Sequence, residues 1–135
     1  MLEPRPITPG LFVEDAGGAR LLAGRCGSCG KPHFPAGPTC PYCAADGCAE
    51  IRVGPDATLR LFTIVQTAPP GYRGPVPYGF GVVELPEGLC VITRLTEPRL
   101  DRLQPGLRMR LTVDVLHTDD EGRPVRSYAF APEAR

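Results

Sequence analysis

The sequence lacks tryptophan, and it contains a single lysine, Lys31, and two histidines. No stretch of it approaches the ~20 apolar residues that a membrane-spanning helix needs. The N-terminus also lacks the apolar run of a secretory signal peptide. We therefore expect a protein that works in the cytoplasm and does not bind a membrane.

An excess of charge of either sign is also missing. The 15 basic residues are balanced by 15 acidic ones, and residues 1–60 alone carry six of each. Proteins that bind nucleic acid usually concentrate basic residues on one face. The balance therefore argues against a nucleic-acid partner, and nucleic-acid binding is kept as the alternative function.

Long helices are not expected, because the chain has 17 prolines and 16 glycines. Alternating apolar and polar residues instead predict about five strands, over residues 57–68, 78–85, 89–95, 107–117 and 125–132. Leu59, Leu61 and Val65 would share one face of the first strand. Val113 and Val115 would lie on the inward face of the fourth. This count and size predict a five-stranded OB-fold barrel, with a small open sandwich as the other possibility.

The order of these segments divides the chain into three parts. Residues 1–20 form a lead-in, with a short helical turn expected at residues 11–15, after Pro9 and before two glycines. Residues 21–50 form a cysteine-rich module, and residues 51–135 form the barrel.

The cysteine module reads "RCGSCGKPHFPAGPTCPYC". Each Cys-x-x-Cys pair can place two thiolates on one metal ion, and two pairs complete a tetrahedral site. A redox dithiol usually needs a single pair at the start of a helix, so the spacing favours metal. The predicted ligands of one zinc ion per chain are Cys26, Cys29, Cys40 and Cys43. Four cysteine ligands leave no position for substrate, so the zinc would be structural.

Residues for catalysis are scarce elsewhere. Cys48 is expected to be a small apolar residue, and Cys90 a buried, inert one within a strand. His117 could in principle activate Cys90, but nothing in the sequence favours that pair. The chain by itself therefore resembles a binding module more than an enzyme.

The order of motifs resembles the family of small zinc-ribbon/OB-fold proteins, a domain of unknown function, that accompany thiolases and thiolase-like enzymes. The cysteine module, "LRLFTIVQTAP", "VPYGFGVVELPEG", "LQPGLRMRLTVDVL" and the terminal "YAFAP" carry the resemblance over residues 20–132. The family has a rubredoxin-like zinc ribbon followed by an OB-fold barrel.

The resemblance implies a non-catalytic subunit of a hetero-oligomer. Its partner would be a thiolase-like protein that cleaves or transfers acyl-CoA thioesters, for example in the degradation of steroid side chains or aromatic acids. Relatives that are fused to a hydratase-like domain differ from this chain, which would act through separate partner chains. The resemblance also implies assembly and a possible contribution to acyl-CoA binding. The candidate residues for contact with partner or CoA are Arg25, Phe34, Tyr72, Arg73 and Tyr78.

Several of these candidates have a second interpretation. Tyr72 and Arg73 lie in a loop rich in Pro and Gly, where exposed aromatic and arginine side chains often bind partners, but the loop could also simply face solvent. Phe34 could meet a partner or pack the ribbon onto the barrel. The strand at 57–67 is apolar on both faces, so either the ribbon or a partner would cover its outer face.

Overall fold

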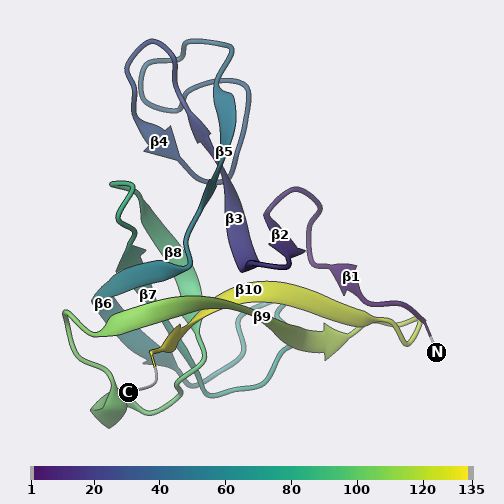
Figure 1. The fold of residues 1–135 in the computed structure, drawn as a ribbon. Coiled ribbons are helices and arrows are strands. Elements are labelled where there is room, and N and C mark those ends of the chain that lie inside the picture. Colours follow the sequence, from purple (N-terminus) through teal and green to yellow (C-terminus); the bar gives the residue numbers. More distant parts are fainter. Residues whose placement is uncertain (1, 134–135) are drawn as a thin grey trace.

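The computed structural model describes residues 2–133, which fold into two β-sheets joined end to end (Figure 1). The smaller sheet lies above the larger one in this view. The strands are β1 (Arg5–Pro6), β2 (Phe12–Asp15), β3 (Gly18–Arg25), β4 (Pro32–His33), β5 (Ala49–Val53), β6 (Asp56–Val65), β7 (Tyr78–Glu84), β8 (Cys90–Leu95), β9 (Arg108–Thr118) and β10 (Pro124–Pro132), with a 3-10 helix η1 at Leu100–Arg102.

The larger sheet closes into a five-stranded barrel. Strand β6 pairs with β7, β7 with β8, and β8 with β10, while β10 pairs with β9 and β9 returns to β6. Only the β8–β10 pairing within this ring is parallel. This arrangement is the Greek-key barrel of the OB fold, which confirms the predicted fold class and excludes the open sandwich. The short β1 adds to β10 outside the ring.

The barrel interior is a close-packed apolar core. Alternate residues of each strand point inward, as a period of two requires. Leu59, Val83, Met109 and Phe130 are completely buried there. Together with the other apolar residues, they remove from water the surface that drives folding.

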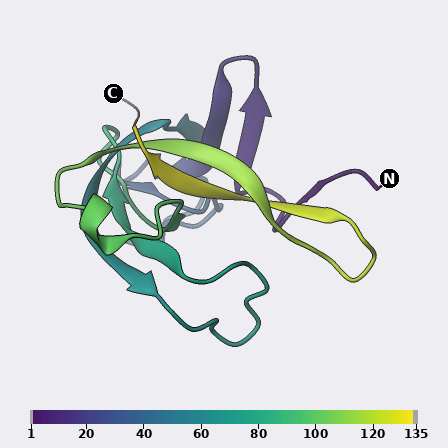
Figure 2. The ribbon, with the colours of Figure 1, turned by 90° about the horizontal axis from the view of Figure 1, so that it is seen from below.

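Two bulges break the alternation, and two sequence predictions of side-chain direction are wrong. The β6–β7 register shifts between Leu59 and Leu61, and the β9–β10 register shifts between Val125 and Arg126. A bulge inserts one residue and turns the following side chains to the other face. Leu61 follows the first bulge and therefore points to solvent, 67% exposed, instead of sharing a face with Leu59. Val115 precedes the second bulge and keeps the phase of Met109 and Leu111. It is 53% exposed because this part of β9 pairs with β10 alone, in a hairpin that projects from the barrel (Figure 2).

The smaller sheet is built around β3, which pairs with β2, β4 and β5. The expected helical turn at residues 11–15 is wrong, because this segment is the strand β2. The Asp15 carboxylate accepts the Gly17 N–H at 2.8 Å, and Gly18 has a φ of 107°. This tight turn sends the chain straight back as β3, so β2 and β3 form a hairpin (Figure 2).

The two sheets share one core. Leu21, Ala23 and Val53 of the small sheet are fully buried in the same cluster as the barrel residues. Phe34 packs edge-on against Tyr128 of β10, with ring centroids 5.5 Å apart. The part of the chain that the structure describes has no helix long and apolar enough to cross a membrane.

Candidate functional site

The four cysteines predicted as ligands lie together at the outer end of the small sheet. Cys26 directly follows β3, and all four sulfur atoms fall within 4.8 Å of one another. The Sγ atoms of Cys26 and Cys43 are 3.5 Å apart, and those of Cys29 and Cys40 are 3.7 Å apart. A tetrahedral zinc with Zn–S bonds near 2.3 Å sets sulfur atoms about 3.8 Å apart. The donor set therefore fits one zinc ion.

Backbone amides prepare these thiols to bind a cation. The amides of Ser28 and Cys29 donate to the Cys26 sulfur at 3.3 and 3.4 Å. The Cys29 amide, followed by that of Ser28, lowers the pKa of Cys26 to about 6. The Ala45 amide lowers the pKa of Cys43, but Cys26 and the other nearby thiols, with burial, raise it to about 12. Four thiolates this close repel one another, and a divalent ion removes that repulsion.

Contacts around the two Cys-x-x-Cys turns, which we call the knuckles, hold the ligands in place. The Arg25 guanidinium donates to the Gly30 carbonyl at 2.9 Å, and Gly30 has a φ of 77°. The Lys31 ammonium lies 5.1 Å from the centre of the Tyr42 ring. Arg25 is thus bound to the metal module itself, which gives this candidate residue a structural contact.

The remaining cysteines lie outside the ligand set. Cys48 is half-buried, and its pKa is raised first by burial and then by the nearby Cys26 and Cys40. Cys90 is exposed, so the prediction that it is buried is wrong. The inward positions of β8 are occupied by Val91 and Thr93, so the side chain of Cys90 points outward.

A second feature is a cavity on the outside of the barrel, which we call the aromatic cavity. Its volume is about 330 Å³, and its walls include Tyr72, Tyr78, Phe80, Ile92, Arg94 and Leu116. The rings of Tyr72 and Tyr78 are stacked, with centroids 4.7 Å apart and planes inclined by 34°. The Tyr72 hydroxyl donates to the Pro75 carbonyl at 2.8 Å, and burial raises the pKa of Tyr72.

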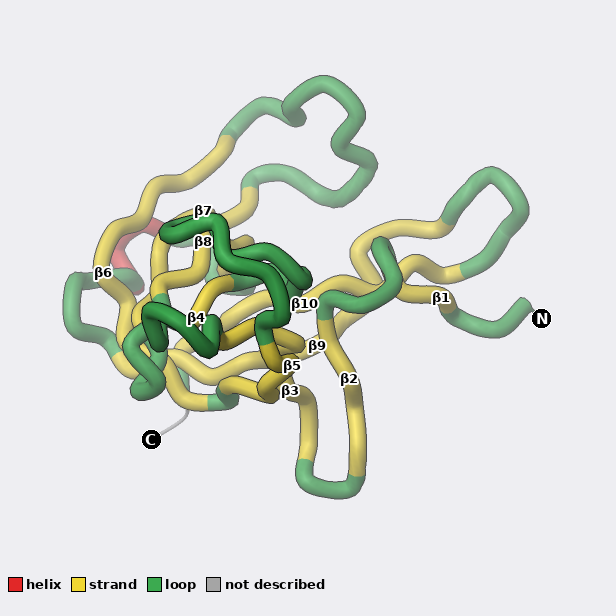
Figure 3. Tube along the Cα trace, turned by 90° about the horizontal axis from the view of Figure 1, so that it is seen from above, coloured by secondary structure: helices red, strands yellow, loops and turns green. Residues whose placement is uncertain are grey.

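The loop between β6 and β7 folds back to form this wall. It projects from the barrel before returning to β7 (Figure 3). A Cβ atom at Gly74 would overlap the Tyr72 ring and approach Leu116 to 2.7 Å. Glycine at this position therefore allows Tyr72 to lie against the barrel instead of pointing into solvent.

The structure brings together only some of the predicted contact residues. Tyr72 and Tyr78 share the aromatic cavity, and Phe34 touches Tyr128, which also lines it. Arg73 instead pairs with Asp120, in the turn between β9 and β10, at 2.8 Å. Arg25 lies apart, in the metal module.

The sequence analysis missed Phe80, Ile92, Arg94 and Leu116 as cavity residues. A signal for the first was present in "YGFGVV". Glycines occupy the inward positions 79 and 81 of β7, so every large side chain of that stretch before Val83 lies on the outer face. The other three come together only through pairing of β8, β9 and β10, which the alternation does not reveal.

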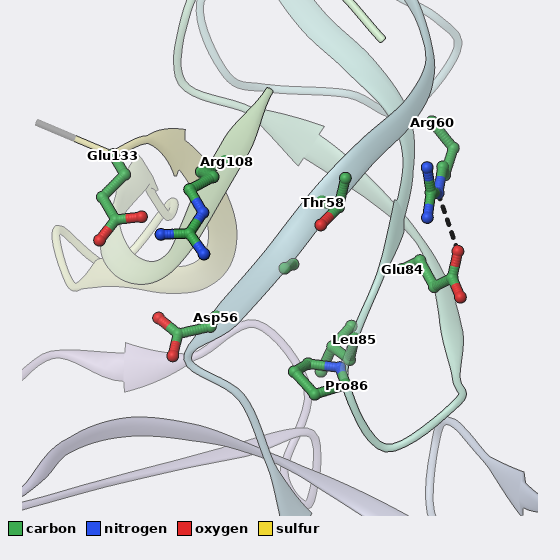
Figure 4. Close-up of a pocket in the computed structure, with 9 residues that line it drawn as sticks. Asp56, Thr58, Arg60, Glu84, Leu85, Pro86, Arg108 and Glu133 are labelled. Atoms are coloured by element: carbon green, nitrogen blue, oxygen red, sulfur yellow. Dashed lines mark hydrogen bonds and ion pairs between the residues drawn. The ribbon is translucent and has the colours of Figure 1, made fainter. Parts of the chain in front are cut away.

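A polar hollow of about 340 Å³ lies at the other end of β6 (Figure 4). Arg60 pairs with Glu84 there at 2.8 Å, and Arg108 extends into the space beside Asp56 and Glu133. Charges of both signs alternate around it. A site for an anion or a metal ion needs an excess of one sign or a set of converging donors, and this hollow supplies neither.

The fold and the metal centre define a class of protein: a structural zinc ribbon placed on an OB barrel. Residues 16–47 match the rubredoxin-like zinc ribbon domain of ChsH2, and residues 50–114 match the C-terminal OB-fold domain of ChsH2. The chain belongs to this family of zinc-ribbon/OB-fold proteins, which confirms the resemblance. The ribbon match and the sulfur geometry together confirm structural zinc.

Relatives in sequence and in structure cover most of the chain. The benzoylsuccinyl-CoA thiolase subunit BbsA of Thauera aromatica is 30% identical over 90% of this chain and 84% of its own. A DUF35 domain-containing scaffold protein of Pyrococcus furiosus is 29% identical over 84% of this chain and 83% of its own. Among solved structures, the Ltp2-ChsH2(DUF35) aldolase aligns with a TM-score of 0.62 and 26% identity, covering 84% of both chains.

Proposed function

We propose that this chain is a non-catalytic accessory subunit of a thiolase-like acyl-CoA complex in the cytoplasm. The observation that carries the proposal is the similarity to the thiolase subunit BbsA across 90% of the chain. The names of two further relatives, a scaffold protein and a member of an aldolase, point to the same kind of assembly.

The metal centre supports a role without chemistry of its own. All four zinc ligands come from the protein, so no position is open for substrate or for an activated water. The nucleophile would therefore lie on a thiolase-like partner, within a hetero-oligomer. Cleavage or transfer of CoA thioesters, for example from steroid side chains or aromatic acids, is the reaction we assign to the complex.

The nucleic-acid alternative has less support. OB folds read nucleic acid with the outer face of their second and third strands, here β7 and β8. Arg60 and Arg94 at the margins of this face are each paired with a carboxylate, Glu84 and Asp114 respectively. Paired arginines supply little of the phosphate attraction on which such binding depends.

We retain five side chains as candidates for contact with the partner or with CoA. The aromatic cavity supports Tyr72 and Tyr78. Phe34 borders it through Tyr128. Arg25 and Arg73 each use one guanidinium nitrogen in a contact within the chain, which leaves their other nitrogens to bind the partner or CoA.

The test is co-expression with a thiolase-like protein of the same genome, beginning with any that is encoded next to this chain. We expect the two proteins to co-elute in gel filtration and to cleave an acyl-CoA together. A thiolase-like protein that is soluble and fully active alone, and that never co-elutes with this chain, would contradict the proposal.

A further inference from the structure

The outer face of β6, β7 and β8 carries a row of apolar side chains. The strand register places Leu61 opposite Val82, and Val82 opposite Ile92. Leu61 is 67% exposed and Ile92 is 64% exposed. Phe80, two residues before Val82 on the same face of β7, is 39% exposed. We call these four residues the apolar ridge.

The ridge continues into the aromatic cavity. Phe80 and Ile92 belong to both, and Tyr78 occupies the outward position two residues before Phe80 in β7. Apolar surface therefore extends from β6 across the sheet to the stacked rings of Tyr72 and Tyr78. A continuous apolar surface of this kind on a folded protein marks a place where another molecule binds.

The origin of the ridge is built into the strands. The bulge after Leu59 turns Leu61 outward, and a Cβ atom at Gly81 would fall on the Leu61 carbonyl oxygen. Glycine at 81 thus lets β6 and β7 approach where the bulge occurs. The inward residues near it are small, and the large side chains of β7 lie outside.

The charges around the ridge are neutralised in pairs. Arg60 pairs with Glu84 at one margin, with 2.8 Å between them, and Arg94 pairs with Asp114 at the other. The side chain of Arg94 is only 16% exposed. Both arginines that the structure describes beside the ridge are paired, so a polyanion or an anionic lipid surface would be attracted weakly, whereas an uncharged apolar protein surface complements this face.

The chain does not cover the ridge with its own ribbon. Phe34, which packs the ribbon on the barrel, contacts Tyr128 of β10. The outer faces of Leu61 and Ile92 remain open to solvent.

We propose that the apolar ridge is the surface on which the thiolase-like partner docks, through an uncharged apolar patch of that partner. This inference rests on the proposed function and adds to it the location of the interface. Leu61 and Ile92 are its most exposed side chains, and the paired arginines form its polar rim.

The experiment compares Leu61→Asp, Ile92→Asp and the double variant with wild-type protein in binding to the co-purified thiolase-like partner. The matched control is Val115→Asp, because Val115 is 53% exposed on β9 but lies outside the ridge. We expect the double variant to bind roughly 100-fold more weakly, as loss of central apolar contacts does at interfaces. The control should bind as wild type does, and all variants should keep the wild-type zinc content and thermal midpoint.

If a variant proves unstable, Leu61→Ser with Ile92→Ser repeats the comparison without adding charge. Wild-type binding that survives the ridge substitutions would overturn the inference and leave the proposed function intact. Failure of the wild-type chain to bind any thiolase-like partner would contradict both the inference and the proposed function. A wild-type dimer of this chain that Leu61→Asp converts to monomers would identify a second copy as the occupant and also overturn the inference.

Discussion

Cys40 and Cys90 differ only in what surrounds their sulfur atoms. Cys40 is buried among the other three ligands and accepts the Tyr42 amide, whereas Cys90 faces solvent on β8. Binding of zinc by such modules supplies roughly 10–16 kcal/mol of apparent free energy. We therefore expect Cys40 to be essential to the fold and Cys90 to be dispensable.

Replacing Cys40 with Ser should remove zinc and soluble protein together, because three thiolates hold the ion poorly and the knuckles have little other packing. Metal analysis of the purified protein measures the first effect, and the soluble yield measures the second. Cys90→Ser is the control and should retain one zinc per chain. Soluble, folded, metal-free Cys40→Ser protein would show that zinc does not hold the ribbon together.

Replacing Gly81 with Ala should destabilise the protein by about 1–3 kcal/mol, the usual cost of forcing extra volume into a packed site. The new Cβ would collide with the Leu61 carbonyl, which is backbone and cannot move aside. Urea denaturation gives the change in unfolding free energy. Gly37→Ala is the control, since its Cβ meets nothing within 4 Å. Equal stability of the two variants would contradict the close approach of β6 and β7.

At the scale of single elements, the sequence predicted the strands better than the direction of their side chains. Alternation located β6 and β9, but it placed Leu61 and Val115 inside. The bulge that turns Leu61 outward needs only one inserted residue, and no glycine or proline marks it in β6. Val115 is exposed because its part of β9 extends beyond the barrel, which alternation cannot show. The metal site could be predicted in full because its four ligands follow from local spacing. The aromatic cavity could not, since it depends on pairing between distant strands.

The turn between β9 and β10 depends on Asp119. Its carboxylate accepts the amides of Arg123 and Glu121 and the Arg5 guanidinium, which ties β1 to this hairpin. The Arg123 amide, then Arg5, lowers the pKa of Asp119 below its ordinary value of 3.8. A lowered native pKa means that Asp119 stabilises the fold fully above its ordinary, unfolded-state pKa and loses this effect as the pH falls further.

Asp119→Ala should therefore lower the thermal midpoint at pH 7 by several degrees, and the gap to wild type should close as the pH falls below about 4. Thermal unfolding followed by circular dichroism between pH 3 and pH 7 measures both. Asp120→Ala is the comparison, because that carboxylate is 90% exposed and pairs only with Arg73 among the contacts of the described chain. A gap that stays constant with pH would show that Asp119 acts through packing rather than charge.

At the scale of the whole molecule, the shared core predicts that the ribbon and the barrel unfold as one unit. Leu21, Ala23 and Val53 are buried in the same cluster as Leu59 and Phe130. Loss of order in the ribbon would expose these side chains and weaken the barrel beneath them.

Removal of zinc by a strong chelator should therefore reduce the protection of barrel amides from hydrogen exchange, in β7 and β8 as well as in the ribbon. Mass spectrometry of the exchanged protein measures this segment by segment, and restored zinc should restore protection. Unchanged exchange in β7 and β8, with rapid exchange confined to residues 26–43, would instead identify two independent units.

The pairing of β1 with β10 constrains how the chain folds. Arg5 aligns with Val125 and Pro6 with Arg126, so β1 must wait for the much later β10 before it can pair. The closing pairs of the barrel, such as Asp56 with Arg110, are also far apart in sequence. Such long-range pairing slows folding, and the apolar ridge is exposed from the moment β6 to β8 assemble. Synthesis close to the partner would shorten the period in which that surface is free to aggregate.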